Sequence, residues 1–335
     1  YLVNLIIISK ENIIILKKLL KKKSWIITDG TKGMENQSIA LAKLLNTNFK
    51  LIKFTPPYLL NKIPLIGRFI PVSMIKMDLN IKQLPKFIIT TGKRMAGISI
   101  FIKFFLKNKI KTIHIQNPKV SSNYFDLLLI PEHDKIIGKN IINTKGALSF
   151  IDNNAIEKSK TSITNNLKHN KKPIILFLIG GDNKRYKPNN TDYYNLTLNI
   201  VKASKSIDGK LIILTSRRTP TKAIKIINSM LKKYENDFYL YSGIGHNPYP
   251  SILKLANFII VTSDSVNMIS ETATFNIPLF VAYLKKEKGK IRDFLENLES
   301  LSIIKKFNGK LFDYNKAKLE TNDETTLKIN KFFSS

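Results

Sequence analysis

The chain has 335 residues, 43% of them hydrophobic, which suits two α/β domains with cores of their own and excludes extensive disorder. It contains no cysteine, which excludes disulfides, thiolate nucleophiles and cysteine zinc sites, and its four histidines form no i,i+4 metal pair. The net charge of +31 comes mostly from lysine, which indicates either a solvated surface or attraction to anionic lipid or nucleotide phosphates. No recognisable nucleic-acid-binding motif accompanies it, so no dedicated nucleic-acid partner is expected.

The first segment, residues 1–23, contains two short apolar runs at 5–8 and 13–16, followed by a cluster of lysines. Neither run reaches the ~18–20 residues needed to span a bilayer. A secretory signal would have its charge before the apolar stretch, and here the charge follows it. We interpret the segment as a basic amphipathic lead-in, with contact to a membrane surface as an open alternative.

Residues 24–155 are predicted to form an N-terminal Rossmann-like domain. Short apolar runs alternate there with amphipathic stretches, which is typical of a parallel sheet covered by helices. The predicted strands lie at 25–28, 51–54, 87–90, 112–115 and 127–130, and the predicted helices at 35–45 and about 95–106.

A polar stretch at 152–172, rich in Asn, Lys, Ser and Thr, predicts the boundary between the domains. The C-terminal domain is predicted to span 172–310, with a tail at 311–335. Its predicted strands lie at 174–179, 211–214, 238–241, 258–261 and 279–282. The predicted fold class is therefore α/β, with two Rossmann-like domains facing a cleft in which ligands of such folds are usually held.

The loop after the first predicted strand is a candidate acceptor-side site. It contains Asp29, Gly30, Gly33, Asn36 and Gln37. Its glycines permit a tight turn and close approach of the backbone, and the following helix start presents free N–H groups. A simple strand-to-helix turn is the alternative.

Lys93 and Arg94 follow the predicted strand at 87–90 and open a helix. Cations at a helix start oppose the helix dipole unless an anion compensates them. The pair therefore predicts binding of a phosphate or carboxylate on the acceptor side, with solvated charge as the alternative.

Glu132, His133 and Asp134 follow the predicted strand at 127–130. Two carboxylates beside an imidazole can orient the ring and raise its basicity, which suits a general base, although a capping and turn cluster is the alternative. Asp29 and His133 are the two candidate catalytic bases.

In the C-terminal domain, candidate binding residues again follow the predicted strands. Gly180 and Gly181 follow its first predicted strand, and Arg217 and Arg218 follow the second. All four are candidate nucleotide- or phosphate-binding residues. Guanidinium groups bind phosphate in bidentate fashion, so the arginine pair suits a diphosphate.

Ser263, Asp264 and Ser265 follow the predicted strand at 258–261, where a helix start can receive phosphate through backbone and hydroxyl donors. Glu271 lies within that helix and can direct a carboxylate to ribose hydroxyls. Of all the residue clusters in the chain, this one indicates a binding site most specifically.

Eight motifs together resemble the mitochondrial fission ELM family, which is found in plants and widely in alphaproteobacteria. They cover about residues 24–285 in the order TDGTKGMENQ, TGKR, QNP, PEHD, IGGDN, TSRRTP, NPY and TSDSVNMISE. Bacterial members resemble GT-B glycosyltransferases, in which an E-x4-G-x-P pattern commonly contacts the nucleotide. This chain has Glu271, Asn276 and Pro278, and Asn can adopt the left-handed conformation of the missing Gly. No GxGxxG with Tyr-x-x-x-Lys epimerase fingerprint is visible.

The resemblance implies a GT-B-type glycosyltransferase that uses a nucleotide-diphosphate sugar as substrate and needs neither metal nor cofactor. The alternative is a non-catalytic binding or scaffold protein of the ELM family in division or envelope organisation. Stretches 56–77 and 101–111 mix apolar and cationic residues, which predicts either peripheral binding to anionic lipid or a buried helix with a loop. We therefore expect a cytoplasmic protein, peripheral on the inner membrane, with a membrane-linked acceptor.

Overall fold

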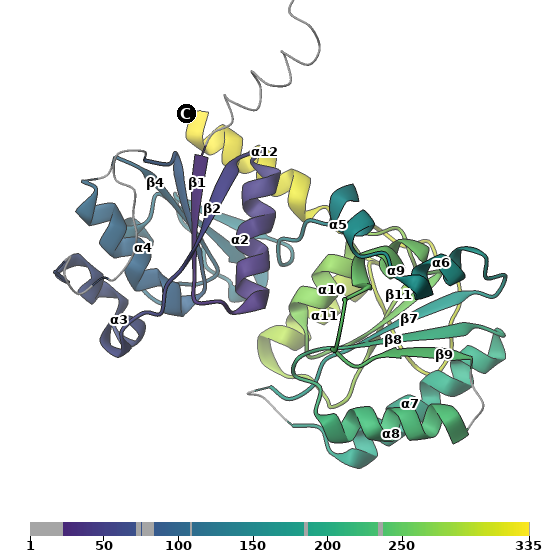
Figure 1. The fold of residues 1–335 in the computed structure, drawn as a ribbon. Coiled ribbons are helices and arrows are strands. Elements are labelled where there is room, and N and C mark those ends of the chain that lie inside the picture. The colour runs from purple at the N-terminus through teal and green to yellow at the C-terminus, as the bar shows by residue number, and fades with distance from the viewer. Residues whose placement is uncertain are drawn as a thin grey trace, which may run out of the picture. The chain divides into compact units, whose positions relative to one another are not determined.

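The computed structural model describes residues 23–71, 75, 84–107, 109–183, 187–233 and 237–334. The chain divides into two compact units: unit 1 is residues 1–144 with 322–335, and unit 2 is residues 145–321. Each unit is α/β and contains a six-stranded parallel sheet (Figure 1). The predicted class, α/β with two Rossmann-like domains, is confirmed, and the cleft between the domains stays a prediction. All but the last residue of the predicted lead-in at 1–23 lies outside the described residues.

The sheet of unit 1 has the order β2-β1-β3-β4-β5-β6, with every neighbouring pair parallel. Its strands are β1 Lys23–Thr28, β2 Asn48–Lys53, β3 Phe87–Thr91, β4 Lys111–Ile115, β5 Leu127–Pro131 and β6 Ile141–Thr144. The strand order reverses between β1 and β3. Open sheets hold their ligands outside the carboxyl ends of the strands at such a switch point.

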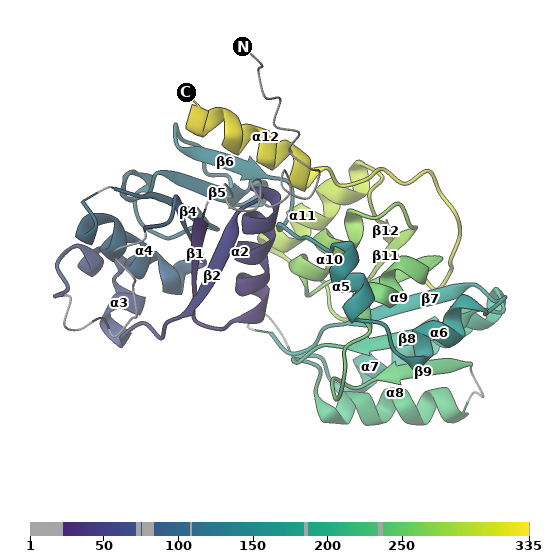
Figure 2. The same ribbon diagram turned by 45° about the horizontal axis from the view of Figure 1, so that its top comes forward.

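The helices of unit 1 include one unusually close contact. They are α2 Lys32–Leu44, α3 Tyr58–Lys62, η1 Pro64–Arg68, α4 Lys93–Phe105, η3 Ser122–Tyr124, η4 Glu132–Asp134 and α12 Thr321–Ser334. A Cβ on Gly67 would lie 2.3 Å from the carbonyl oxygen of Gly97, so η1 and α4 meet backbone to backbone. The predicted tail at 311–335 thus contains a helix, α12, which lies beside the sheet of unit 1 (Figures 1 and 2), with the ring of Phe333 centred 5.2 Å from that of Phe87.

The sheet of unit 2 has the order β12-β11-β10-β7-β8-β9, again parallel throughout. Its strands are β7 Ile174–Ile179, β8 Lys210–Thr215, β9 Phe238–Tyr241, β10 Phe258–Thr262, β11 Leu279–Ala282 and β12 Lys305–Lys306. Renumbered within the unit, this is the 3-2-1-4-5-6 order of the Rossmann fold, and its switch point lies between β7 and β10.

Helices cover both faces of this sheet (Figure 1). They are α5 Asn153–Lys158, α6 Ser162–Lys168, α7 Asn190–Ser206, α8 Thr221–Lys233, α9 Tyr249–Leu255, α10 Val266–Ala273 and α11 Gly289–Ser300. Alternate residues of β7 face opposite cores, one shared with α9, α10 and α11 and the other with α7 and α8. Because both faces are buried, the strand is a continuous apolar run, which is why the sequence predicted it.

The domain boundary differs from the predicted one. The polar stretch at 152–172 belongs to unit 2 and forms α5 and α6. Its polar residues are helix caps, since Asp152 accepts a hydrogen bond from the Ala155 amide at 2.7 Å. The stretch is anchored to α9, because the Ser251 amide donates to the Ser159 hydroxyl at 2.9 Å. Polar composition here marks short capped helices, and the chain passes between the units at residues 144–145 instead.

Candidate functional site

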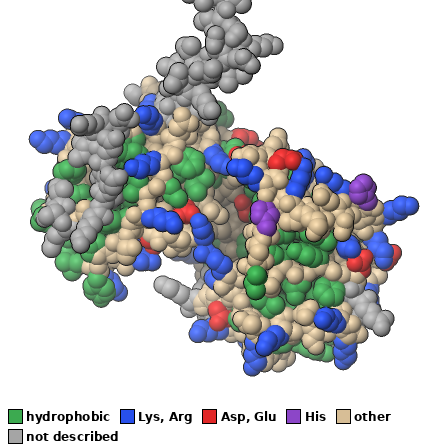
Figure 3. Space-filling view, in the orientation of Figure 1, with side chains coloured by type: hydrophobic (Ala, Val, Ile, Leu, Met, Phe, Trp, Pro, Cys, Tyr) green, Lys and Arg blue, Asp and Glu red, His purple; other side chains and the backbone are tan. Residues whose placement is uncertain are grey.

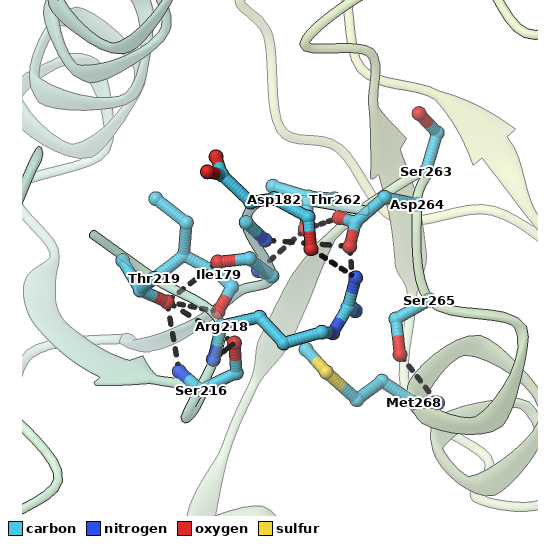
Figure 4. A network of polar contacts seen from close by, with 12 residues as sticks. Ile179, Asp182, Ser216, Arg218, Thr219, Thr262, Ser263, Asp264, Ser265 and Met268 are labelled. Atoms are coloured by element: carbon cyan, nitrogen blue, oxygen red, sulfur yellow. Dashed lines mark hydrogen bonds and ion pairs between the residues drawn. The ribbon is translucent and has the colours of Figure 1, made fainter. Parts of the chain in front are cut away.

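Three loops meet at the switch point of unit 2. Because β7 lies between β10 and β8 in a parallel sheet, the loops that follow these strands are neighbours at one edge. They contain the predicted nucleotide-binding residues, with the glycine pair in the centre. Figure 4 shows the polar network that joins the three loops.

An ion pair between Arg218 and Asp264 holds this network together. The guanidinium contacts the Asp264 carboxylate at 2.6 Å, and a second guanidinium nitrogen donates to the carbonyl of Asp182 at 3.3 Å. The Asp264 side chain is fully buried, whereas that of Arg218 is 40% exposed. The carboxylate also accepts from the Thr262 hydroxyl at 2.7 Å and from the Gly181 amide at 3.3 Å. A buried charge needs this degree of pairing and hydrogen bonding.

Gly180 and Gly181 are required by packing within this network. A Cβ on Gly180 would lie 2.2 Å from the Asp264 carboxylate oxygens, and one on Gly181 would lie 2.1 Å from the Arg218 carbonyl oxygen. The Thr219 hydroxyl closes the same loop by donating to the Gly180 carbonyl at 2.5 Å. The two glycines therefore let the loops after β8 and β10 meet across β7.

Arg217 differs from its neighbour. Its side chain is exposed, and it forms no hydrogen bond or ion pair within the described part of the chain. The predicted arginine pair is thus divided: Arg218 joins the loops, while all the guanidinium donors of Arg217 are available to a ligand.

The two serines after β10 also have different surroundings. Ser263 is fully buried, and its hydroxyl donates to the Glu287 carboxylate at 2.9 Å. Ser265 caps α10 by accepting a hydrogen bond from the Met268 amide at 3.4 Å. Only Ser265 is positioned at the helix start as expected.

Glu271 lies on α10 and forms a hydrogen bond that the sequence did not indicate. The Tyr249 hydroxyl, on the first residue of α9, donates to its carboxylate at 2.9 Å. Burial raises the pKa of the Glu271 carboxyl to about 7, even though this hydrogen bond lowers it. Burial and the nearby Glu271 charge also raise the pKa of the Tyr249 phenol well above its usual value.

The helix that presents Glu271 is fixed at its far end. Lys316 is buried, and its ammonium group donates to the carbonyls of Ala273 at 3.0 Å and Phe275 at 2.7 Å. A cation at the end of a helix satisfies free carbonyls and complements the dipole. The Ser270 hydroxyl also accepts from the Ala147 amide at 3.0 Å. These contacts hold α10 in one position.

Glu271→Gln is expected to stabilise unit 2 by roughly 1–2 kcal/mol at pH 8. A carboxyl whose folded pKa exceeds its unfolded value contributes stability only while it is protonated, and this contribution is lost as pH rises from 4.5 toward 7. The amide removes the partly buried charge and still accepts a hydrogen bond from Tyr249. Urea unfolding at pH 8 and pH 4 tests this, because the gain should vanish at pH 4. Glu296→Gln, at an exposed position on α11, is the control, and equal effects of both variants would contradict the assignment.

The switch point of unit 1 is bridged by a second Arg–Asp pair. Arg94, at the start of α4, contacts Asp29, after β1, at 2.9 Å. The Asp29 side chain is 6% exposed, and its other oxygen accepts from the Thr31 amide at 2.9 Å. Both oxygens of this candidate base are therefore occupied, and the anion that compensates Arg94 is supplied by the protein itself.

The remaining residues of the first loop lie in different environments. Gly30 has a φ of 82°, which only glycine adopts readily, so the turn requires it. Gly33 lies in the first turn of α2, and Asn36 is exposed on that helix. Gln37 is buried, and its amide donates to the Gly33 carbonyl at 3.3 Å. Gln37 is thus part of the interior, whereas Lys93 is exposed at the start of α4.

The structure does not bring Asp29 and His133 together. His133 lies with Glu132 and Asp134 in η4, directly after β5. Strands β3 and β4 separate β1 from β5, which corresponds to about 14 Å at the usual strand spacing. The two candidate bases therefore cannot act on the same proton.

Two buried ionisable residues of unit 1 were not predicted. The Glu35 side chain is 3% exposed and contacts the Lys32 ammonium at 2.6 Å, while its Oε2 has no partner in the described part of the chain. His114 on β4 is fully buried, with Nδ1 2.8 Å from the Thr90 hydroxyl. Desolvation lowers its pKa to about 3. No sequence pattern distinguishes either residue from its neighbours.

Among the residues that the structure describes, no group of three or more His, Asp or Glu side chains could hold a metal ion. No helix in the same ranges is long and apolar enough to cross a membrane. Arg185, which follows the glycine loop of unit 2, lies outside the described residues.

A model of the protein family described as Mitochondrial fission ELM1 matches residues 32–332. The chain belongs to the mitochondrial fission ELM1 family. This confirms the resemblance found in the motifs. Protein RP120 of Rickettsia prowazekii (strain Madrid E) is 28% identical over 327 residues, which cover 85% of this chain and 90% of that protein. Mitochondrial fission protein ELM1 of Arabidopsis thaliana is 24% identical over 251 residues, 68% of this chain and 58% of that protein.

Solved structures of other proteins share the fold of this ELM1 family member. The S. aureus MnaA–UDP complex has a TM-score of 0.52 at 16% identity, covering 94% of this chain and 88% of that chain. The UDP-GlcNAc 2-epimerase of Methanocaldococcus jannaschii, in complex with UDP-GlcNAc and UDP, has a TM-score of 0.50 at 13% identity, covering 94% and 99%. At these identities the similarity establishes the fold.

Proposed function

We propose that this ELM1 family member binds a nucleotide-diphosphate sugar at the β7/β10 switch point of unit 2 and transfers the sugar to an acceptor. The observation that supports this most is the exposed residue Arg217, in the loop after β8 next to the glycine loop after β7, at the switch point of a Rossmann-ordered sheet. The proteins of the same fold that were solved with UDP or UDP-GlcNAc are consistent with such a ligand.

Each residue has a distinct role in the proposal. Arg217 binds the diphosphate, and Arg218 uses its exposed edge for the same anion while holding Asp264. The start of α10 at Ser265 supplies further donors, and Glu271 contacts the ribose hydroxyls. Positive side chains and helix starts stabilise the developing charge on a leaving diphosphate, so neither a metal nor a cofactor is required.

The acceptor side lies in unit 1 in this proposal. Lys93 and Arg94 attract an anionic acceptor, while Asp29 or His133 takes the proton of the attacking hydroxyl. Attack on the sugar carbon breaks its bond to the diphosphate, which leaves with the nucleotide. The acceptor is proposed to be membrane-linked, with the protein peripheral on the cytoplasmic face of the inner membrane.

A second candidate is binding without turnover, as a scaffold in division or envelope organisation. Two observations favour it: the match to an Arabidopsis protein named for mitochondrial fission, and the full occupation of both Asp29 oxygens. A protein of this kind would bind the nucleotide and release no product.

Calorimetry with UDP, UDP-GlcNAc, GDP-, CMP- and ADP-sugars tests the proposal. Binding of at least one ligand is expected, and Arg217→Ala should weaken it by roughly tenfold or more, because a charge-assisted phosphate contact is lost. Arg292→Ala, an exposed arginine of α11, is the matched control. Equal affinities of Arg217→Ala and the wild type would rule out the site. Product analysis by NMR, with candidate acceptors present, then separates transfer from binding alone.

A further inference from the structure

The outer face of α3 and η1 is apolar where a surface helix is normally polar. Leu60, Pro64 and Gly67 are buried against unit 1. The large apolar side chains around them are exposed, with exposed fractions of 74% for Tyr58, 54% for Leu59, 49% for Ile63, 38% for Leu65 and 77% for Phe69. We call these five residues the α3 face. A contiguous exposed apolar surface usually marks an interaction site.

Cations are placed among these side chains. The guanidinium carbon of Arg68 lies 5.5 Å from the ring centre of Phe69, 4.8 Å from that of Phe104 and 5.6 Å from that of Tyr124. The Lys62 ammonium lies 5.6 Å from the ring centre of Tyr58. Aromatic rings with Lys and Arg close to them are typical of segments that lie in the interface of a bilayer.

The sequence on both sides of the α3 face contains almost no negative charge. Residues 36–125 contain fifteen Lys or Arg residues and a single acidic residue, Asp78. Asp126, the next acidic residue, already faces Lys103 at 3.4 Å and Lys111 at 3.8 Å. Figure 3 shows hydrophobic and positively charged side chains intermingled over unit 1. A second copy of the chain would place two surfaces of the same sign together, and an anionic partner without apolar groups would leave the α3 face in water.

We propose that the α3 face docks on an anionic lipid bilayer. Tyr58, Leu59 and Phe69 enter the interfacial region, while Lys62 and Arg68 contact lipid phosphates. This places unit 1 on the membrane without a spanning helix. The inference extends the acceptor side of the proposed function, and it does not depend on nucleotide binding by unit 2.

Flotation of the full chain with vesicles tests this docking. The wild type should float with vesicles of equimolar phosphatidylglycerol and phosphatidylcholine. It should remain in the bottom fraction with vesicles of phosphatidylcholine alone. Leu59→Ser with Phe69→Ser should lower the partition coefficient at least roughly tenfold, because two apolar side chains no longer leave water. Lys62→Glu with Arg68→Glu should lower it by a similar factor, because lipid phosphates repel the new charges.

Matched variants at other surface positions distinguish loss of docking from a general effect of changed surface hydrophobicity or charge. Leu301→Ser with Leu327→Ser removes two exposed apolar side chains, and Lys222→Glu with Lys225→Glu reverses two exposed charges of α8. Neither pair should alter flotation, and circular dichroism melting should show that all variants fold. Unchanged flotation of both α3-face variants would overturn the proposal, as would a wild-type dimer that these variants dissociate. UDP calorimetry on the same variants reports on unit 2 separately.

Discussion

Replacing Arg218 with alanine is expected to destabilise unit 2 by about 2–3 kcal/mol. The substitution leaves the fully buried Asp264 carboxylate without its cation. We place the effect below the usual range for buried pairs, because the Arg218 side chain is 40% exposed and Asp264 keeps its hydrogen bonds to Thr262 and Gly181. Arg217→Ala should change stability by less than about 0.5 kcal/mol, since its side chain is exposed.

Hydrogen exchange of the β7 and β10 amides is the suitable measurement, since the sole tryptophan, Trp25, lies in unit 1. A double-mutant cycle of Arg218→Ala and Asp264→Ala gives the coupling free energy between the two side chains, because the double variant no longer buries an unpaired carboxylate. Equal loss of protection in Arg217→Ala and Arg218→Ala would show that the ion pair does not support the loops.

Acidification is expected to destabilise unit 1 through His114, by about 3 kcal/mol at pH 4. The folded pKa of this histidine is about 3, below its usual value of 6.5, so the unfolded chain binds a proton that the folded chain rejects. The stability that comes from the neutral ring is complete above pH 6.5 and declines by about 1.4 kcal/mol per pH unit as pH falls toward 3. The ring cannot gain solvent, because it is fully buried and lies against Phe125 with ring centres 5.0 Å apart.

Urea unfolding followed by Trp25 fluorescence reports on this unit, because Trp25 is buried in its core. His114→Gln retains a polar partner for the Thr90 hydroxyl and does not titrate, so its stability should depend less on pH between 6.5 and 4. His169→Gln is the control, at a residue of unit 2. If wild type and His114→Gln lose stability in parallel over this range, the acid sensitivity has another origin.

Most strands could be predicted from the sequence because both faces of each sheet are covered, which makes a strand such as β7 a continuous apolar run. The prediction missed β6 and β12, which have four and two residues, and whose polar residues resemble those of loops. It also misjudged the stretch at 152–172, since capping residues and linker residues have the same composition. The return of α12 to unit 1 depends on tertiary packing, such as that between Phe333 and Phe87, that no local pattern encodes.

The candidate site could be predicted to the level of its loops, because parallel strands deliver their following loops to one edge. The pairing within it could not. Arg218 and Asp264 are 46 positions apart, and the sequence does not show that one neutralises the other. The sequence predicts that the glycine pair binds nucleotide or phosphate, whereas its packing constraint comes from Asp264 and the Arg218 backbone. Tyr249 lies in a recognised motif, yet only the fold shows that it contacts Glu271.

The backbone contact between Gly67 and Gly97 joins the α3 face rigidly to α4, the helix that begins at Lys93. Phe104, which contacts Arg68, lies near the other end of this thirteen-residue helix, and thirteen residues correspond to a length of about 20 Å. The contact at Gly97 is much nearer to the start of α4, because Gly97 is three residues beyond Arg94, or about 5 Å along the helix axis. In the proposed docking, the bilayer therefore also fixes where Lys93 and Arg94 lie relative to its surface.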